Sequence, residues 1–441
     1  MNDIIIGLAT TLGQSSVAII RLSGDKVIDF VDQVFSHDLK NCQPNTISYG
    51  YIEHDNEIID EVLISVFHGP NSFTAEDVVE INCHGGVFIT RKIFNLLTSL
   101  GARIAEPGEF TKRAFLNGRI NLTEAEAVME TIKANNDHAS KLAIKSLQGS
   151  ISRKIKELKQ PLLDIIAELE VNIDYPEYEI PEIEKKQELL AKTLKEMSRM
   201  HNDSHRHNYL FNGVKVAILG KPNVGKSTIL NVILDEEKAI VSDIAGTTRD
   251  MIEATTMLSG IPINLIDTAG IRETEDTIEK IGVDKALRVM EQADLILYTI
   301  DNNDAIAKNE EEIIKEQLDK VIVVVNKIDQ NDKKVKIANA DIVYISALNN
   351  KGIDKLKEII TNKLRINEIN NNDLYLNERQ NALIGSAIEE LSILVDKFNE
   401  LETEFLLIEL RSICEKLSEI TGEVYYDSLL DNIFASFCLG K

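Results

Sequence analysis

Cysteine is scarce in this 441-residue sequence, and the four cysteines that occur are scattered. Cys42, Cys83, Cys414 and Cys438 include no C-x-x-C pair. This distribution argues against a disulfide framework and a zinc site, and it fits a reducing compartment. Long apolar runs are also missing: none approaches the roughly 20 residues of a membrane span, and the first residues lack the basic and apolar regions of a secretory signal. We therefore expect a cytoplasmic protein without membrane contact.

The sequence has no excess of positive charge either. Its 48 lysines and arginines are outnumbered by 72 aspartates and glutamates, which gives a formal net charge of −24. A protein that binds nucleic acid unaided usually carries a basic surface, and this composition does not favour one. Any contact with RNA is therefore expected to be local or made mainly through a partner. The length suffices for roughly three domains of about 150 residues.

The N-terminal 118 residues have the pattern of a compact α/β domain. Short β-like runs such as 18–22 and 62–67 alternate with turn clusters such as 68–71 and 105–108.

Beyond this region, two distant segments repeat apolar residues at steps of three and four, as one face of a helix does. The first stripe predicts a long helix that Pro161 can kink, and it consists of Leu147, Ile151, Ile155, Leu158, Leu162, Ile165 and Leu169. The second stripe predicts one continuous helix, and it consists of Ala387, Leu391, Leu394, Phe398, Leu401, Phe405 and Ile408. Because each stripe needs a partner, we expect residues 119–210 and 371–441 to form one discontinuous helical domain.

Residues 211–370 interrupt this helical domain, and polar stretches at 201–212 and 367–373 mark the junctions. Helical stretches in the insertion alternate with β-like runs at 215–219, 262–267, 294–301, 321–326 and 342–346. This alternation predicts a doubly wound parallel sheet. A nucleotide-driven change in the insertion would act on both flanking helical segments.

The run 220–227, of sequence GKPNVGKS, directly follows the first of these strands and leads into a helix. Its glycines let the backbone curl so that N–H groups point at phosphate oxygens in front of a helix N-terminus. Lys226 then reaches the β- and γ-phosphates, and Ser227 binds Mg²⁺. The run predicts a nucleotide-binding protein.

Four further elements follow in order along the chain. A Gly/Thr-rich loop at 246–250 supplies Thr248 as a second Mg²⁺ ligand. The run 267–270 (DTAG) ends a strand, so that Asp267 lies near the metal and Gly270 lets the backbone approach the γ-phosphate. The runs 326–329 (NKID) and 346–348 (SAL) end two more strands. The ordered set makes a chance match to the phosphate loop improbable.

Asp329 indicates which base is bound. Its carboxylate offers two acceptors that match the adjacent N1–H and N2–H₂ donors of guanine. Adenine presents an acceptor at N1, so a buried carboxylate facing it would lose about 1–3 kcal/mol or more per unmade bond. The sequence therefore predicts a guanine nucleotide.

The residue after Gly270 is Ile271, which cannot orient an attacking water as the glutamine of small regulatory GTPases does. The charged residues that follow, among them Glu279, are candidates for this role but are more simply explained as surface charges. Asn223 differs, because its amide oxygen inside the phosphate loop can bind a monovalent cation. Such a cation would do the electrostatic work of an arginine finger.

Three blocks outside the nucleotide motifs carry a family resemblance. They are 69–74 (GPNSFT) with 76–80 (EDVVE), 107–111 (PGEFT) through 113–118 (RAFLNG), and 431–434 (DNIF) with 437–441 (FCLGK). With these blocks the sequence resembles, over essentially its whole length, the MnmE (TrmE) family of potassium-activated GTPases of tRNA wobble-uridine modification. The resemblance implies a multidomain α/β plus α protein with an N-terminal folate-binding domain (1–118), a helical bundle domain (119–210 plus 371–441) and an inserted Ras-like P-loop GTPase domain (211–370).

The resemblance also implies a homodimer whose N-terminal domain binds 5-formyl- or methylene-tetrahydrofolate. By position, Arg21, Glu80, Arg119 and Lys441 would line that pocket. Cys438 keeps two interpretations, a sheltered packing residue or a thiol active in one-carbon chemistry. We favour packing, because Lys441 is the sole nearby residue in sequence that would lower its pKa.

For the GTPase, the resemblance assigns water positioning to Glu279 and K⁺ coordination to Asn223 with the 242–247 loop. It implies a heterotetramer with MnmG, a flavoprotein that uses FAD and NADH. The two proteins together would build a carboxymethylaminomethyl or aminomethyl group at C5 of uridine 34 in certain tRNAs. An acidic subunit that leaves most tRNA binding to its partner agrees with the net charge of −24.

The motifs and the resemblance together define the expected site. The catalytic residues are Glu279, Asn223 and Lys226. The Mg²⁺ ligands are Ser227 and Thr248, and the K⁺ ligands are Asn223, Ser242, Ile244 and Thr247. The GTP-binding residues are Asn223, Val224, Gly225, Lys226, Ser227, Thr228, Ser242, Asp243, Ile244, Ala245, Gly246, Thr247, Thr248, Asp267, Thr268, Ala269, Gly270, Asn326, Lys327, Asp329, Ser346, Ala347 and Leu348.

Two other functions stay open at this point. One is a ribosome-assembly or other regulatory GTPase switch without one-carbon chemistry, although the sequence shows no RNA-binding appendage and its acidity argues against one. The other is a folate-binding scaffold whose GTPase is only regulatory.

Overall fold

The computed structural model describes residues 3–43, 46–175, 183–235, 252–258, 260–266, 289–304, 306–331, 335, 337–364, 374–437 and 440. The chain divides into two compact units. The first consists of Met1–Ile132, Ile144–Ser198 and Glu378–Lys441, and the second consists of Lys133–Ala143 and Arg199–Asn377.

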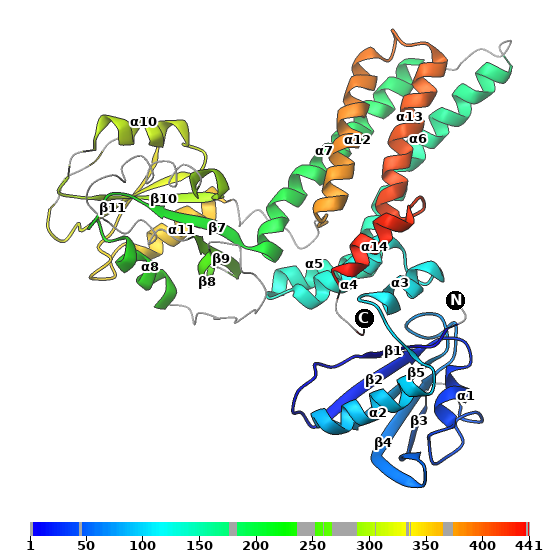
Figure 1. Cartoon of the computed structure of the whole chain (residues 1–441). Helices are drawn as coiled ribbons and strands as arrows, with labels where there is room; N and C mark the ends of the chain where they lie inside the picture. The colour runs from blue at the N-terminus through cyan, green and yellow to red at the C-terminus, as the bar shows by residue number, and fades with distance from the viewer. Residues whose placement is uncertain are drawn as a thin grey trace, which may run out of the picture. The chain divides into compact units, whose positions relative to one another are not determined.

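The N-terminal part of the first unit is built on a six-stranded sheet of order β3-β4-β5-β2-β1-β6 (Figure 1). Its strands are β1 (Ile5–Leu8), β2 (Val17–Ser23), β3 (Thr46–His54), β4 (Glu57–Phe67), β5 (Val78–His84) and β6 (Arg103–Ile104). All neighbours pair antiparallel except β1 and β6, which are parallel. The expected α/β character of this region is therefore confirmed.

Alternation along the strands separates the two faces of this sheet. One face packs against helices α1 (Val27–Asp32) and α2 (Val87–Ser99) in a single apolar core. The opposite face carries exposed Ile47, Tyr49 and Leu63 on β3 and β4. Because side chains of a strand alternate between faces, Arg21 and Glu80 lie on this second face.

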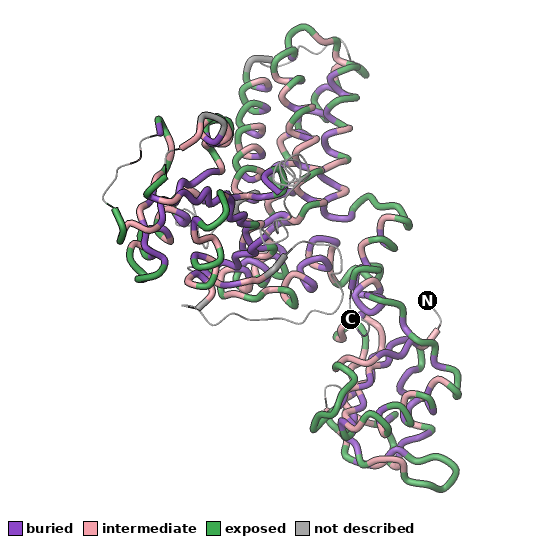
Figure 2. The backbone as a smooth tube through the Cα atoms, turned by 60° about the vertical axis from the view of Figure 1, so that its left-hand side comes forward, coloured by how far each residue is buried: buried purple, intermediate pink, exposed green. Residues whose placement is uncertain are grey.

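The rest of the first unit is helical. It contains α3 (Glu109–Leu116), α4 (Leu122–Lys133), α6 (Ser150–Asp174), α12 (Glu378–Lys397), α13 (Thr403–Thr421) and α14 (Asp427–Ala435). Helices α5 (Asp137–Leu147) and α7 (Ile183–Asn212) have one part in each unit. The helices of the bundle turn their buried sides inward (Figure 2).

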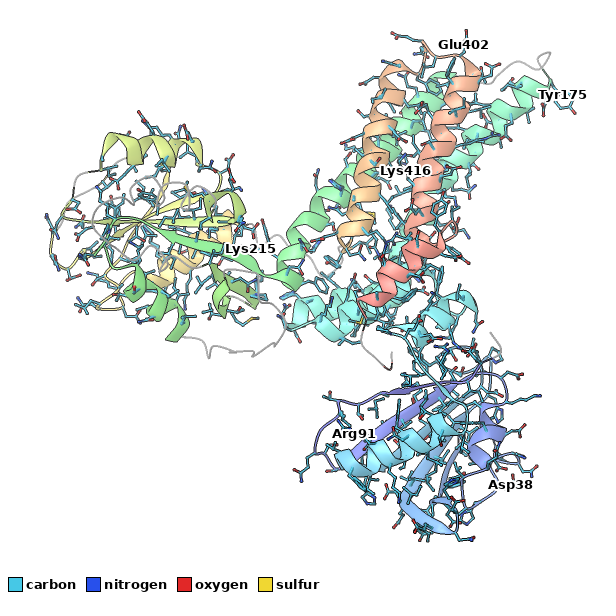
Figure 3. All side chains as sticks on the ribbon, in the orientation of Figure 1. Asp38, Arg91, Tyr175, Lys215, Glu402 and Lys416 are labelled. Carbon is cyan, nitrogen blue, oxygen red and sulfur yellow. The ribbon has the colours of Figure 1, made fainter. Side chains whose placement is uncertain are left out.

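The expected pairing of the two distant helical segments is confirmed, because α6 packs against α13. Lys159 on α6 donates to the hydroxyl of Ser418 on α13 at 2.7 Å. Arg411 on α13 pairs with Glu170 on α6 at 2.5 Å. Helix α13 also contacts α12, where Lys416 reaches Glu390 at 2.6 Å (Figure 3).

The helix boundaries differ from those expected. The second apolar stripe is not one helix, because α12 ends at Lys397 and α13 begins at Thr403. Within α13, Phe405 and Ile408 are exposed, and the buried face starts instead with Leu406 and Leu407. The prediction continued the apolar spacing of α12 across the break at 398–402. It therefore placed the wrong side of α13 in the core.

A further correction concerns the first segment. Leu147 ends α5 and does not belong to the long helix, which starts at Ser150 and continues through Pro161. The polar stretch 201–212, expected to mark a junction, forms the last turns of α7, and the division between the two units falls just before it, at Ser198 and Arg199. Polar residues suit an exposed helix face as well as a junction.

The second unit contains a six-stranded sheet of order β12-β11-β10-β7-β9-β8. Its strands are β7 (Val214–Leu219), β8 (Ile252–Leu258), β9 (Ile261–Ile266), β10 (Leu295–Asp301), β11 (Val321–Asn326) and β12 (Asp341–Tyr344). Five strands are parallel, as expected, and strand order reverses at β7. Sequence reasoning missed β8, which pairs antiparallel with β9 at the edge of the sheet.

Helices cover both faces of this sheet. On one face, α8 (Lys226–Asp235) and α11 (Ile353–Lys363) contribute to a core with alternate strand residues. On the other face, α10 (Lys308–Glu316) contributes Ile314. Burial on both faces explains why the central strands read as continuous apolar runs rather than as alternating patterns.

Side chains join the segments through which the chain enters and leaves the second unit. The Ser204 hydroxyl donates to the carbonyl of Leu376 and accepts from its N–H, both at 2.9 Å. The rings of Phe211 and Tyr375 stack with centroids 4.1 Å apart. The end of α7 and residues 375–376 are therefore fastened together.

Within the residues that the structure describes, no helix is long and apolar enough to cross a membrane.

Candidate functional site

The phosphate loop joins the end of β7 to the start of α8, at the point where strand order reverses. Gly220 has φ 140°, and a Cβ there would lie 2.2 Å from the carbonyl oxygen of Thr299. Gly225 has φ 99°, and its Cβ would lie 2.3 Å from Nδ2 of Asn326. A side chain at position 220 would displace the backbone of Thr299, and one at position 225 would displace the side-chain amide of Asn326. These glycines form a cradle whose backbone can approach phosphate oxygens closely.

Lys226 begins α8 and folds back over this loop. Its ammonium group donates to the carbonyl oxygens of Gly220 at 2.8 Å and Lys221 at 2.7 Å. Ser227 and Thr228, next along the helix, are exposed. The lysine and the two hydroxyls therefore gather where a helix N-terminus favours negative charge, which suits a phosphate chain.

The loop after β11 is fastened to the phosphate loop. Asn326 is buried, and its side chain donates to the carbonyl of Val224 at 2.9 Å and accepts from the N–H of Ala347 at 3.0 Å. Lys327 donates to the carbonyl of Asn223 at 2.7 Å and pairs with Asp301 at 2.6 Å. Two of the predicted base-binding segments and the phosphate loop therefore form one connected site.

Asn223 has φ 64°, a left-handed conformation that asparagine tolerates better than most residues. Its side chain is exposed, while its carbonyl is held by Lys327. Burial opposes ionisation of Asp301, but the bond from Lys327 keeps the pKa of this carboxyl below its ordinary value. A stable charge on Asp301 thus supports the lysine that holds Asn223.

Asp329 lies at the rim of this site. The hydroxyl of the buried Ser346 donates to its Oδ1 at 2.5 Å, which fixes the carboxylate. The carboxylate is exposed, contrary to the burial assumed in the argument for guanine selection. Leu348 nearby in sequence is also exposed, at 81% of its surface. Strand ends open toward solvent, so the sequence position of Asp329 did not determine its burial.

Sequence reasoning missed a group of side chains behind the phosphate loop. Glu310 on α10 is buried and accepts from Lys221 at 2.8 Å, from the N–H of Ala307 at 2.9 Å and from the hydroxyl of Tyr298 at 3.1 Å. Burial would raise the pKa of Glu310, but these donors, Lys221 first, bring it below the ordinary value. Lys221 and Glu310 are 89 positions apart, so no local pattern indicated the pair.

Several predicted site residues lie outside the described residues. They are Ser242, Asp243, Ile244, Ala245, Gly246, Thr247, Thr248, Asp267, Thr268, Ala269, Gly270 and Glu279 of the nucleotide site, and Cys438 and Lys441 at the C-terminus.

A second cluster lies on the N-terminal sheet. Arg21 on β2 and Glu80 on β5 are cross-strand partners, and the guanidinium donates from Nε to the carboxylate at 2.8 Å. Arg21 also donates to the carbonyl of Gly440 at 3.3 Å. Arg119 shares with Arg21 a contact to the ring of Phe73. The structure thus brings together three of the four residues expected in the folate pocket and places Gly440, the neighbour of the fourth, against them.

Comparison with family models identifies two parts of the chain. Residues 4–119 match the model described as "GTP-binding protein TrmE N-terminus". Residues 122–438 match the model described as "MnmE helical domain".

Curated relatives are similar over the whole chain. The tRNA modification GTPase MnmE of Staphylococcus aureus strain MSSA476 is 41% identical over 458 aligned positions, which cover 100% of this chain and 99% of that protein. The protein of the same name from strain Newman shows the same identity and coverage.

Among solved structures, Era from Aquifex aeolicus bound to GDP.AlF4- is 35% identical, covers 34% of this chain and 56% of that chain, and has a TM-score of 0.27. The G domain of the FeoB iron transporter from T. maritima is 29% identical, covers 34% of this chain and 98% of that chain, and has a TM-score of 0.26. By its two family-model matches and its full-length similarity to curated relatives, the chain belongs to the MnmE family of tRNA modification GTPases.

Proposed function

We propose that the chain is a K⁺-activated GTPase that acts with a flavoprotein partner, MnmG, on C5 of uridine 34 in certain tRNAs. The two proteins would install a carboxymethylaminomethyl or aminomethyl group, with GTP hydrolysis driving domain rearrangement. The observation that carries the K⁺ proposal is that Lys327 holds the backbone carbonyl of Asn223, a residue of the phosphate loop whose side chain is exposed. The relatives that support the tRNA role are named tRNA modification GTPases.

The glycine cradle suits the phosphates of a nucleoside triphosphate. The residues around the cradle suggest how the phosphates and the metal ions are held. Lys226 and the loop N–H groups would bind the β- and γ-phosphates, and Ser227 with Thr248 would hold Mg²⁺. Asn223, Ser242, Ile244 and Thr247 would hold K⁺. A bound K⁺ supplies positive charge next to the phosphates, where negative charge increases during the reaction.

The remaining roles follow from the same proposal. Glu279 would orient the attacking water in place of the missing glutamine. Asp329, held by Ser346, would accept from the guanine base and Asn326 would keep the base loop fastened to the phosphate loop.

The second cluster supports a reduced-folate pocket formed by Arg21, Glu80, Arg119 and Lys441. The open sheet face beside it carries exposed Ile47 (67%), Tyr49 (54%) and Leu63 (46%). Adjacent exposed apolar residues of this kind suit a protein interface, and we propose a homodimer through this face. The organisation into an N-terminal domain (1–118), a helical domain (119–210 and 371–441) and a GTPase domain (211–370) is part of the proposal.

The GTPase proposal is tested by comparing GTP turnover of the purified protein in K⁺ and in Na⁺. Asn223→Gly removes the amide without the strain that alanine would meet at φ 64°. We expect K⁺ stimulation in the wild type and its loss in this variant, while Asn95→Ala on the exposed side of α2 keeps it. Equal turnover in the two salts would contradict the proposal.

The tRNA role is tested separately, by nucleoside analysis of tRNA from a deletion strain. We expect unmodified C5 at uridine 34, restored by the wild-type gene. Normal modification in the deletion strain would contradict this part of the proposal.

A further inference from the structure

One aromatic ring in the N-terminal part of the first unit contacts two arginines. The guanidinium carbon of Arg21 lies 4.9 Å from the centroid of the Phe73 ring, and that of Arg119 lies 5.0 Å from it. Arg21 also lies 5.8 Å from the ring of Phe110, which is fully buried. The negative face of an aromatic ring attracts cations, so Phe73 interacts favourably with both guanidinium groups.

The loop that carries Phe73 is fastened to the two segments that carry these arginines. The neighbouring Thr74 is fully buried, and its hydroxyl lies 2.7 Å from that of Ser23 at the end of β2. Its carbonyl accepts from the side chain of Asn117, just after α3, at 2.8 Å. Arg21 lies two residues before Ser23 and Arg119 two residues after Asn117. Thr74 therefore holds Phe73 at a fixed place between the two arginine-bearing segments.

The two arginines have different support. Arg21 is held by Glu80 and by the carbonyl of Gly440 as well as by the rings. Arg119 is exposed, and the contact with Phe73 is what connects it to the rest of the cluster in the described structure. The Phe73 ring is half-buried and packs against the apolar cluster of Ile5, Ala105 and Phe110, so leucine keeps an apolar side chain against that cluster.

We propose that Phe73 is a positioning residue of the one-carbon-donor pocket, whose ring holds Arg21 and Arg119 together in the arrangement that receives a carboxylate-bearing reduced folate. The inference rests on the proposed function of this pocket. It adds a residue that acts through the arginines, and it predicts that the aromatic face of Phe73, rather than its apolar volume, is what matters.

Two substitutions separate these properties. Phe73→Leu keeps an apolar side chain and removes the ring, whereas Phe73→Tyr keeps the ring. Phe88→Leu is the matched control, because Phe88 is exposed and lies on α2, which covers the other face of the sheet. The full-length variants are compared by melting temperature and by calorimetric titration with 5-formyltetrahydrofolate.

We expect Phe73→Leu to weaken 5-formyltetrahydrofolate binding about tenfold, in line with the loss of two cation–π contacts. Phe73→Tyr and Phe88→Leu should bind like the wild type, and all variants should melt near the wild-type temperature. A folded Phe73→Leu variant with wild-type affinity would overturn the inference.

A second readout does not depend on the ligand. Phenylglyoxal modifies accessible arginines, and mass spectrometry gives the rate at Arg119. Arg119 is exposed, but its guanidinium lies over the Phe73 ring, so Phe73→Leu should raise the modification rate at Arg119 and Phe73→Tyr should not. Unchanged rates would overturn the inference, whereas a wild type that binds no 5-formyltetrahydrofolate but shows the rate difference would contradict only the proposed ligand of the pocket.

Discussion

Lys221 in the phosphate loop and Glu310 on α10 form an ion pair, with the ammonium nitrogen 2.8 Å from the carboxylate. The carbonyl of the same lysine accepts from Lys226 at 2.7 Å. Lys221 thus joins Lys226, which is proposed to bind the phosphates, to a buried carboxylate that Tyr298 also holds. The pair fixes the phosphate loop against a helix far away in sequence.

Removing this pair should weaken nucleotide binding without unfolding the domain. Because Lys221 is half exposed, we expect Lys221→Met to raise the KM for GTP only about fivefold, as for a charged hydrogen bond worth about 1 kcal/mol. Lys221→Arg keeps the charge and should restore most of the affinity. Steady-state GTP hydrolysis gives KM and kcat, and an unchanged KM in the methionine variant would show that the pair does not position the loop.

Asp329→Asn should change the base that the protein prefers. The amide keeps one acceptor for N1–H of guanine but turns a donor toward N2–H₂, so one bond worth about 1–3 kcal/mol is lost and kcat/KM for GTP should fall at least about fivefold. Xanthine carries a carbonyl in place of the amine, so xanthosine triphosphate should become the better substrate. Asp304→Asn, in an exposed loop, serves as the control. Unaltered preference for GTP in the Asp329 variant would refute the role of this carboxylate.

Arg113 should be important for stability of the N-terminal part. It is 1% exposed and pairs with Asp3 at 2.7 Å, Glu76 at 3.1 Å and Glu109 at 3.1 Å. Arg113→Met would remove the cation from Glu76 and leave Asp3 and Glu109 with Arg103 alone, at a cost of about 3–5 kcal/mol. Lys92→Met removes an exposed pair with Glu57 and should cost at most about 1 kcal/mol. Chemical unfolding measures both, and similar costs for the two variants would contradict this view.

The same carboxylates should make the N-terminal part sensitive to acid. Burial would raise the pKa of Glu109, but bonds from Arg103, the backbone of Glu106 and Arg113 lower it below the ordinary value. A carboxyl group that has a lower pKa in the folded than in the unfolded state stabilises the folded state at any pH above its unfolded-state pKa. This stabilisation is lost as the pH falls through the folded-state pKa. We therefore expect resistance to urea to fall from about pH 5 downward, since the unfolded pKa lies near 4.3.

Glu109→Gln tests this assignment, because it removes the titrating group and keeps the shape. The variant should be less stable than the wild type at neutral pH, and the two should become more alike as pH falls below about 4. An equal pH dependence in both proteins would assign the acid sensitivity to other groups.

The local motifs were predictable because each depends on a short run of chain. The glycines at 220 and 225 were assigned to a cradle from their spacing, and the structure shows left-handed or strained backbone with no room for a Cβ at either position. The parallel strands were recognisable as apolar runs, because a sheet covered on both faces needs apolar residues throughout. The edge strand β8 lacked such a run and was missed.

Contacts between distant segments were not predictable in this way. The apolar spacing of 387–408 continued by chance across a turn, and only the packed structure shows that Leu406 and Leu407, rather than Phe405, are buried. Lys221 and Glu310 offered no signal, because ion pairing between distant positions leaves no trace in residue spacing. The ring of Phe73 lay in a block that indicated the family, yet nothing in that block showed which arginines it contacts.

The sequence by itself therefore determined the residues available to this protein: a glycine-rich phosphate loop, a carboxylate proposed to bind guanine, and the motifs that it shares with its family. These depend on residue types and on neighbours a few positions apart. Only the tertiary structure decided which charges meet, which faces stay open and which side chains hold the reactive groups in place, because those relationships are formed when strands and helices far apart in the chain pack together.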